Sequence, residues 1–497
     1  MSQIGGTGPQ RGQAGLYGST SGSGHPSVNP PAAPLVGGGG GIGPLKLVLG
    51  ALVTGLFAGA ALVGAQGVVI RLAGVGAQWQ AGQPRPPAEL PLAAVSSSGP
   101  SPTVEGIAAA IAPLRTAGLG ASPRISIADA ASGVTLYTDG ADTPAVPAST
   151  IKLVTAITSL AARGPAYQIA TRAVAGASPG EVVLVGGGDP TLSAGANGSY
   201  PGAARLDELA QQVRAALGST VPSKVIYDSS LFTGDKLGPG WDADVPTGGY
   251  GAPVTALMAD GARVNPRQVD TPSARVQQPD LSAAQSFAKA LGVPTSAVTA
   301  GTAPPEGRQL GLVNSLPVIR LVEIMITESD NLIAEALARQ VALAKGQPAS
   351  FVGGGTAIGA VLTELGIPTA GAVLADGSGL SRQDRLTPAT LIGVLVTAAR
   401  PDQPQLHGLY SGLAVAGYSG TLADRFRSAA NGSAAAGLVR AKTGTLSGVS
   451  AIAGTVVDAD GRALAFAVMV DSSVQGTAAA QAALDRITAV LAACGCR

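Results

Sequence analysis

Ser149 and Lys152 stand three residues apart where a segment with helical spacing of apolar residues, 151–160, begins. Because positions i and i+3 lie on one face of a helix, we expect the serine hydroxyl within hydrogen-bonding reach of the lysine amine. Burial near a helix N-terminus and near like charge lowers the pKa of a lysine from its free value of about 10.4 toward neutrality. A neutral amine makes the neighbouring serine a nucleophile with its own base.

The same serine-to-lysine spacing recurs at Ser286 and Lys289, within the string PDLSAAQSFAKALG. There the helix is expected to begin near Pro279 and Asp280, which places Ser286 in mid-helix. A hydroxyl in mid-helix tends to bond a backbone carbonyl of its own helix. We therefore predict that the reactive serine is Ser149.

Two further strings of polar residues follow in the chain. TESDNLIAEAL holds a Ser-Asp-Asn triplet in a helical region, and VRAKTGTLSG holds Lys-Thr-Gly-Thr on a strand that ends in a turn. Each string alone has an ordinary explanation, as a helix cap or a strand end. Together with the first pair, in this order along the chain, they indicate one shared catalytic site. The residues of the two strings are Ser329, Asp330, Asn331, Lys442, Thr443, Gly444 and Thr445.

The composition of the chain excludes several other classes of function. The formal net charge is +1, charged residues make up 12% and aromatic residues 3% of the sequence, which argues against nucleic-acid binding. The two histidines, His25 and His407, do not form a metal site, and we predict neither a metal nor a cofactor. Cys494 and Cys496 are separated by one residue and cannot staple the fold, so we interpret them as incidental.

Three N-terminal segments differ from the rest in composition. Residues 1–44 are rich in Gly, Pro and Ser and predict a disordered cytoplasmic tail. Residues 45–71 hold an uncharged apolar run of about 19 residues, which spans roughly 28 Å as a helix and predicts a transmembrane signal-anchor. Residues 72–102 are a predicted Pro/Ala-rich linker. The remaining chain is therefore expected outside the cytoplasm, anchored in the cell membrane by one span, or secreted if the segment is cleaved.

The rest of the chain predicts an α/β (α+β) fold. Residues 103–167 have the pattern of a helix, a hairpin and the helix after Ser149. Residues 306–497 predict several helices, then three strands and a last helix. Strands near both ends suggest one antiparallel sheet flanked by helices. Residues 168–305, with short strand-like runs between Gly and Pro, predict an inserted β-rich domain that divides the catalytic domain in two.

The set of motifs resembles a known signature. Ser-x-x-Lys, Ser-Asp-Asn and Lys-Thr-Gly occur in this order in penicillin-binding proteins and serine β-lactamases. The long gap between Lys152 and Ser329, and the strings LVGGGDPTL, YDSSLF, ADGSGLSRQDRLTP and AGYSGTLADRF, are similar to the class C low-molecular-mass penicillin-binding proteins. This D-alanyl-D-alanine carboxypeptidase/endopeptidase family is matched from about residue 103 to about residue 492. The resemblance implies a β-lactamase/transpeptidase-like domain, split by an insertion after the helix of the nucleophile.

The resemblance also implies a reaction and its partners. Ser149 would attack the carbonyl of the penultimate D-alanine in a peptidoglycan stem peptide, with Lys152 as the favoured general base. The backbone amides of Ser149 and Thr445 would hold the oxyanion, and water would then cleave the acyl-enzyme. β-Lactam antibiotics such as penicillin would acylate the same serine and stay there. The enzyme would be a serine-type D-Ala-D-Ala carboxypeptidase, a DD-endopeptidase, or both.

By the same resemblance, the other motif residues bind substrate or transfer a proton. Ser329 and Lys442 would relay a proton to the leaving D-alanine. Asn331 would bond the peptide amide of the substrate. The strand segment that would bind the terminal carboxylate consists of Lys442, Thr443, Gly444 and Thr445.

Four further residues have softer roles. Asp244 and Tyr250, in PGWDADVPTGGYGAP, lie where similar enzymes present an acid and a tyrosine to the diamino acid of the peptide. The alternative for this pair, a solvated loop in a Gly/Pro-rich stretch, stays open. Asp376 and Arg382, in ADGSGLSR, are expected to hold a structural loop rather than to take part in chemistry.

Two other functions compete with the peptidase. A serine β-lactamase needs a deacylating glutamate on a loop of the E-x-x-L-N kind, and the candidate Glu364, in TELGIP, lacks the asparagine and resembles a helix end. A non-catalytic penicillin-binding or peptidoglycan-binding protein would keep the motifs without turnover. The intact serine, lysines and asparagine argue against it.

Overall fold

The computed structural model describes residues 99–115, 119, 123–269, 272–428, 432–471 and 476–497. The predicted tail at 1–44, the predicted membrane span at 45–71 and most of the predicted linker at 72–102 lie outside these residues. Among the residues described, no helix is both long and apolar enough to cross a bilayer.

The first sheet joins strands from both ends of the chain, as predicted. Its six strands run in the order β2-β1-β11-β10-β9-β8, and every neighbouring pair is antiparallel. The pair that joins the two parts of the chain aligns β1 with β11, so that Ile127 lies opposite Phe466. The strands are β1 (Arg124–Asp129), β2 (Thr135–Asp139), β8 (Ala414–Val415), β9 (Val439–Leu446), β10 (Val449–Val457) and β11 (Ala463–Val470).

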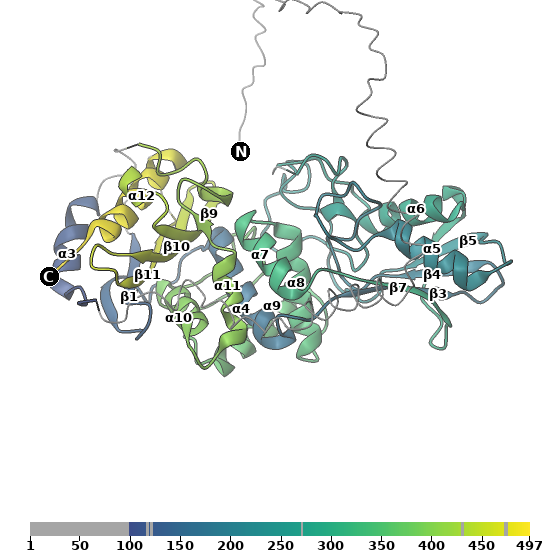
Figure 1. Cartoon of the computed structure of the whole chain (residues 1–497), viewed down its shortest axis with the longest axis horizontal. Helices are drawn as coiled ribbons and strands as arrows, with labels where there is room; N and C mark the ends of the chain where they lie inside the picture. The colour runs from purple at the N-terminus through teal and green to yellow at the C-terminus, as the bar shows by residue number, and fades with distance from the viewer. Residues whose placement is uncertain (1–98, 116–118, 120–122, 270–271, 429–431, 472–475) are drawn as a thin grey trace, which may run out of the picture. The chain divides into compact units, whose positions relative to one another are not determined.

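The two faces of this sheet are covered by different helices because alternate residues point to opposite sides. In β11 the larger side chains Leu464, Phe466 and Val468 pack into one core with helices α3 (Val104–Ile111) and α12 (Thr477–Ala493). The alternate residues of β11 are mostly alanines, and they pack into a second core with α4 (Lys152–Arg163) and α10 (Pro388–Ala399) (Figure 1). Small side chains on this face let the helices that carry the site approach the sheet closely.

Helix α4 lies in the middle of the helical layer. It packs against α7, α8, α9 and α10, and its residues from Lys152 to Leu160 are all buried. The polar residues Thr158 and Ser159 are tolerated there because each hydroxyl donates to a carbonyl of the preceding turn. The other helices of the layer are α7 (Val318–Thr327), α8 (Asn331–Ala344), α9 (Phe351–Glu364) and α11 (Gly408–Ser411).

A second sheet has its own core and is built from the middle of the chain. Its order is β6-β5-β4-β3-β7; β3 pairs antiparallel with β4 and β7, whereas β4, β5 and β6 are parallel. Two helices pack on it, so this region is α/β as well as β-rich. The predicted boundary at residue 305 falls before β7, which pairs with β3 and therefore extends this sheet to Asn314. The elements are β3 (Ala170–Ala175), β4 (Glu181–Val185), α5 (Leu206–Leu217), β5 (Lys224–Asp228), α6 (Pro279–Leu291), β6 (Val298–Ala300) and β7 (Gln309–Asn314).

Short 3₁₀ helices connect these elements, and the one that matters for the site is η2, which leads into α4. The described 3₁₀ helices are η1 (Ala112–Leu114), η2 (Ala148–Ile151), η3 (Asp260–Ala262), η4 (Thr295–Ala297), η5 (Pro404–Leu406), η6 (Gly420–Leu422) and η8 (Ser433–Ala435).

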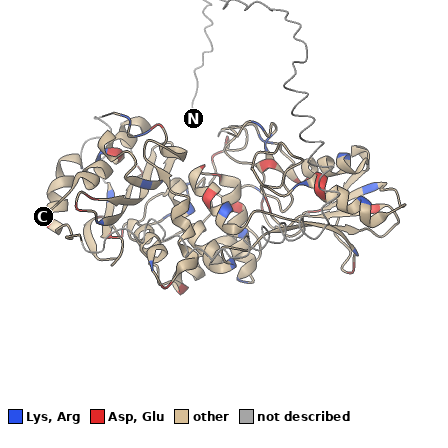
Figure 2. Ribbon diagram, in the orientation of Figure 1, with Lys and Arg blue, Asp and Glu red and all other residues tan. Residues whose placement is uncertain are grey.

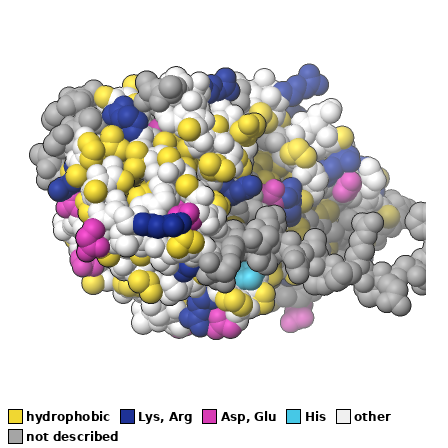
Figure 3. Space-filling model, turned by 60° about the vertical axis from the view of Figure 1, so that its left-hand side comes forward, with side chains coloured by type: hydrophobic (Ala, Val, Ile, Leu, Met, Phe, Trp, Pro, Cys, Tyr) yellow, Lys and Arg dark blue, Asp and Glu magenta, His cyan; other side chains and the backbone are white. Residues whose placement is uncertain are grey.

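Charge is sparse over the described surface. Figure 2 shows few acidic or basic segments along the ribbon. On the face drawn in Figure 3, charges of both signs are dispersed among apolar side chains, and no extended basic patch is visible there.

The C-terminal Cys494 and Cys496, interpreted from the sequence as incidental, are joined in a disulfide.

Candidate active site

Ser149 lies in η2, one turn before α4, at a point where the backbone is strained. The preceding residue, Ala148, has a φ of 45°, in the left-handed region that residues with a side chain seldom adopt. Strain of this kind persists only where the surroundings impose it, and it concentrates at functional sites. Ser149 is partly exposed, whereas Ala148 and Thr150 on either side are buried.

Lys152 is completely buried, and its amine contacts three oxygen atoms. The Nζ atom lies 2.9 Å from Ser149 Oγ, 2.6 Å from Asn331 Oδ1 and 2.6 Å from the carbonyl oxygen of Ser378. The hydrogen bond expected from the i, i+3 spacing is therefore present. The amide and carbonyl oxygens can only accept, so in a neutral amine they take both N–H groups and leave the lone pair facing the Ser149 hydroxyl.

Burial sets the protonation of this lysine. It lowers the pKa of Lys152 to about 8, and the negative charges of Asp376, Glu335, Asp330 and Asp384, which favour the ammonium form, only partly oppose that effect. A substantial neutral fraction therefore exists in mildly alkaline solution.

Lys442 is the second buried cation of the site. Its amine donates a 2.8 Å hydrogen bond to the carbonyl oxygen of Thr443. Burial, together with the nearby charge of Lys152, holds the pKa of Lys442 well below its usual value. The like-charge effect that the sequence suggests therefore occurs between these two lysines. The hydrogen bonds of the described residues do not include one between Lys442 and Ser329.

Each residue of the Ser-Asp-Asn triplet has a separate position at the junction of α7 and α8. Ser329 has a left-handed φ of 57°, the second strained residue beside the site. Asp330 caps α8, because its Oδ1 accepts from the amides of Leu332 and Ile333 at 2.9 and 3.0 Å. Asn331 contacts Lys152 through Oδ1 and donates from Nδ2 to the carbonyl oxygen of Tyr250 at 2.9 Å.

Two residues of the inserted region hold Asp330 from the other side. The Tyr200 hydroxyl donates to Asp330 Oδ2 at 2.7 Å, and Arg263 donates to the same hydroxyl at 2.7 Å. All three side chains are buried. Burial alone would raise the pKa of Asp330, but Arg263 and Arg275 outweigh it and lower that pKa. Sequence reasoning missed Tyr200 and Arg263, since they are isolated polar residues in a stretch with no helical or strand period.

Strand β9 approaches Ser149 closely at Gly444. A Cβ atom at Gly444 would lie 2.5 Å from the carbonyl oxygen of Pro147 and 3.2 Å from the amide nitrogen of Ser149. Strand β8 pairs with β9 only at Arg440 and Ala441, so the described sheet leaves the later part of β9 open on this edge. The open edge therefore runs past the amide of Ser149.

The two threonines of this strand differ in exposure. Thr443 is buried and donates to Thr421 Oγ1 at 2.8 Å. Thr445 is exposed, and its hydroxyl accepts from Gln481 at 3.3 Å.

Asp244, Tyr250 and Arg382, which the sequence places outside the three motifs, lie at the edge of the site. Asp244 is exposed and Tyr250 is 44% exposed, and Tyr250 reaches the motif residues through its backbone carbonyl. Arg382 pairs with Asp242 at 2.8 Å and donates to the carbonyl oxygen of Ser447 at 3.1 Å. Arg382 therefore connects the inserted region, through Asp242, to the turn after β9.

Ser286, which has the same spacing to a lysine as Ser149, bonds its own helix as predicted. Ser286 lies within α6, and its hydroxyl donates to the carbonyl oxygen of Ser282 at 3.0 Å. It is therefore engaged with its own helix.

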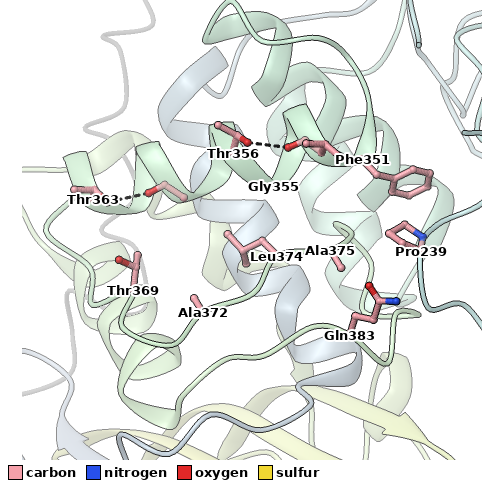
Figure 4. A pocket seen from close by; sticks show the side chains of 12 residues that line it. Pro239, Phe351, Gly355, Thr356, Thr363, Thr369, Ala372, Leu374, Ala375 and Gln383 are labelled. Carbon is pink, nitrogen blue, oxygen red and sulfur yellow. Dashed lines mark hydrogen bonds between the residues drawn. The ribbon is translucent and has the colours of Figure 1, made fainter. Parts of the chain in front are cut away.

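A cavity of about 730 Å³ lies between α9 and the segment 369–383 (Figure 4). It contains none of the predicted site residues. Its lining is formed by Pro239, Phe351, Val352, Gly355, Thr356, Gly359, Thr363, Thr369, Ala372, Leu374, Ala375 and Gln383.

The fold and the three motifs around Ser149 define a class C low-molecular-mass penicillin-binding protein. The chain matches the D-Ala-D-Ala carboxypeptidase 3 (S13) family over residues 109–272 and 266–493, and it belongs to that family.

Similar proteins support this assignment. A carboxypeptidase of Mycobacterium tuberculosis is 40% identical over 425 residues, which cover 83% of this chain and 89% of the relative. Carboxypeptidase DacB of Mycolicibacterium smegmatis is 42% identical over 430 residues, covering 83% and 90%. The crystal structure of penicillin binding protein 4 (dacB) from Haemophilus influenzae has the same fold, with a TM-score of 0.64 and 23% identity over 76% of this chain and 97% of that chain.

Proposed function

We propose that this serine D-Ala-D-Ala carboxypeptidase cleaves peptidoglycan stem peptides through an acyl-enzyme on Ser149. The observation that carries the proposal is the environment of Lys152. Two oxygen atoms accept the N–H groups of its neutral amine, so that the lone pair of the amine points toward the Ser149 hydroxyl. Membership of the S13 family supports the substrate class.

In the proposed acylation step, Ser149 Oγ attacks the carbonyl of the penultimate D-alanine and its proton passes to Lys152 Nζ. The peptide C–N bond then breaks as the proton on Lys152 is relayed through Ser329 and Lys442 to the leaving D-alanine, which returns Lys152 to its neutral form. In the second step Lys152 takes a proton from the water that attacks the ester, and gives it to Ser149 Oγ as the ester bond breaks. β-Lactams would acylate the same oxygen.

The proposed binding groups surround Ser149. The amides of Ser149 and Thr445 would donate to the oxyanion, which the close approach of β9 to η2 supports. The hydroxyls of Thr443 and Thr445, with Lys442, suit the terminal carboxylate. Asn331 would bond the substrate amide, in which case its hydrogen bond to the Tyr250 carbonyl is exchanged on binding.

Gly444→Ala should lower kcat for D-alanine release by about 10²-fold, the cost of losing one oxyanion donor. The added methyl group would collide with the carbonyl of Pro147 and push β9 away from the Ser149 amide. A matched control is Gly359→Ala, where the new methyl group meets only Leu374, at 3.8 Å. Steady-state kinetics of both variants test this, and wild-type turnover by Gly444→Ala would argue against an oxyanion hole at β9.

The β-lactamase alternative has little support. Glu364 lies at the end of α9, pairs with Lys345 at 2.6 Å and is exposed at the surface. We also propose endopeptidase activity on cross-linked stems, and the edge of β9 that the described strands leave unpaired beyond Ala441 supports it. Asp244 and Tyr250 are proposed to meet the diamino acid.

The test is release of D-alanine from a stem pentapeptide ending in D-Ala-D-Ala, beside the same peptide ending in D-Ala-L-Ala. We expect release from the first peptide only, and a cross-linked dimer measures endopeptidase activity. Rapid turnover of benzylpenicillin without peptide cleavage would instead favour a β-lactamase. Absence of both activities would favour a binding protein.

Topology along the chain is also proposed. Residues 1–44 would be a cytoplasmic tail, 45–71 a membrane anchor and 72–102 a linker to a catalytic domain outside the membrane. That domain would be formed by residues 103–167 and 315–497, with the inserted region extended from the predicted 168–305 to include β7. The uncharged run in 45–71 supports the anchor.

A further inference from the structure

A short loop, residues 375–384, supplies one of the three partners of Lys152. Two of its own carboxylates hold its backbone. Asp376 accepts from the amides of Gly379 and Ser381 at 2.6 and 2.8 Å, and Asp384 accepts from the amide of Ala375 at 2.7 Å. The loop is therefore closed on itself, which confirms its expected structural character.

Glu335 is the carboxylate that fixes this loop from outside. It lies on α8, four residues after Asn331, and is completely buried. Its Oε1 accepts from the amides of Gly377 and Ser378 at 3.1 and 2.9 Å. Its Oε2 pairs with Arg339 at 3.2 Å, and the guanidinium of Arg339 lies 4.1 Å from the centre of the Phe351 ring.

The carbonyl oxygens of the same two residues, Gly377 and Ser378, face α4. Thr155 donates to the carbonyl oxygen of Gly377 at 2.7 Å, and Lys152 contacts that of Ser378 at 2.6 Å. No side chain fits between Gly377 and α8, because a Cβ atom at Gly377 would lie 2.7 Å from the Cβ atom of Ala338. The Gly377–Ser378 peptide unit is therefore held from both sides, by Glu335 of α8 and by Thr155 of α4, and it fixes the Ser378 carbonyl that follows it.

We propose that Glu335 is a positioning residue for Lys152, holding the Ser378 carbonyl where it takes one N–H of the amine and turns the lone pair toward Ser149. A buried ion pair such as Glu335–Arg339 adds little stability over an apolar pair, so stability alone does not account for it. Helix α8 thus fixes the amine twice, directly through Asn331 and indirectly through Glu335. The inference rests on the proposed function, since it assigns Lys152 as the base.

Charge gives this role a measurable signature. Burial and the neighbouring Asp376 raise the pKa of Glu335 to about 7, so the carboxylate is largely ionised where Lys152 titrates. Its negative charge favours the ammonium form of Lys152. Removing that charge therefore shifts the titration of the lysine to lower pH. The other charged or titratable groups facing this pair are Asp330, Arg339, Asp376, Asp384 and Lys442.

The test measures the second-order rate constant of acylation of the full chain by benzylpenicillin over a range of pH. In Glu335→Gln, which keeps an oxygen acceptor but no charge, we expect the midpoint of the acidic limb to fall by about half a pH unit or more. Glu364→Gln, at an exposed ion pair, should leave the profile unchanged. A wild-type midpoint and plateau in Glu335→Gln would overturn the inference.

Glu335→Asp covers the case in which Glu335→Gln does not fold, because it keeps the charge that pairs with Arg339. It withdraws the oxygen by one methylene group, so we expect the plateau to fall by about 10-fold with the midpoint near its wild-type position. A wild-type plateau in Glu335→Asp would overturn the positioning role. Absence of any adduct on the wild-type chain would overturn the proposed function itself, and this inference with it.

Discussion

Ser149→Ala should release D-alanine from a stem pentapeptide at least about 10⁴-fold more slowly than the wild type, because the variant lacks the oxygen that forms the acyl-enzyme. The substitution removes one partly exposed oxygen, so the fold and the Lys152 contacts to Asn331 and Ser378 should survive. Steady-state kinetics of D-alanine release measure the loss.

Ser286→Ala is the matched control for this prediction. It has the same i, i+3 relation to a lysine, but its hydroxyl bonds the Ser282 carbonyl within α6. We expect wild-type turnover from it. A Ser149→Ala enzyme with more than a few per cent of wild-type activity would mean that the nucleophile lies elsewhere.

Lys152→Met should lower kcat by about 10³-fold, since methionine fills much of the buried space of the lysine stem but cannot accept the Ser149 proton. Two oxygen acceptors, Asn331 Oδ1 and the Ser378 carbonyl, lose their donor as well. The wild-type rate should rise with pH through about 8, because the active form is the neutral amine and the pKa of Lys152 is lowered to about 8. That limb should be absent from the variant.

Circular dichroism and thermal unfolding establish that the Lys152→Met chain is folded before its kinetics are compared. A folded variant that keeps a limb near pH 8 would assign the titration to another group. Lys442, whose pKa is held below its usual value by burial, would then be the first candidate.

Much of the catalytic fold follows from local patterns. The strand-like apolar run at residues 463–470 and the alternating run that begins near residue 124 predict two strands, and they pair as β11 and β1. The end of the second sheet could not be placed in this way. Strand β7 belongs to it only because it pairs with β3, more than a hundred residues earlier, and a pairing of that length leaves no local signal.

The site was predictable where side chains carry the chemistry. Ser149 and Lys152 follow from spacing, whereas the contact of Lys152 with Asn331 was not predicted, since the family resemblance assigned Asn331 to the substrate amide. The third partner of Lys152 is the backbone carbonyl of Ser378, and a backbone contact of this kind cannot be predicted from the residue type. Glu335 has a signal in the sequence: with Arg339 four residues later, it places two charges on one face of a mostly apolar helix.

The most direct test of an acyl-enzyme on Ser149 is the intact mass of the full chain after incubation with benzylpenicillin, followed by peptide mapping. Wild type and Ser286→Ala should each gain one persistent adduct, located on the peptide that contains Ser149, and Ser149→Ala should gain none. An adduct on Ser149→Ala, or a wild-type chain that gains no adduct, would contradict the account.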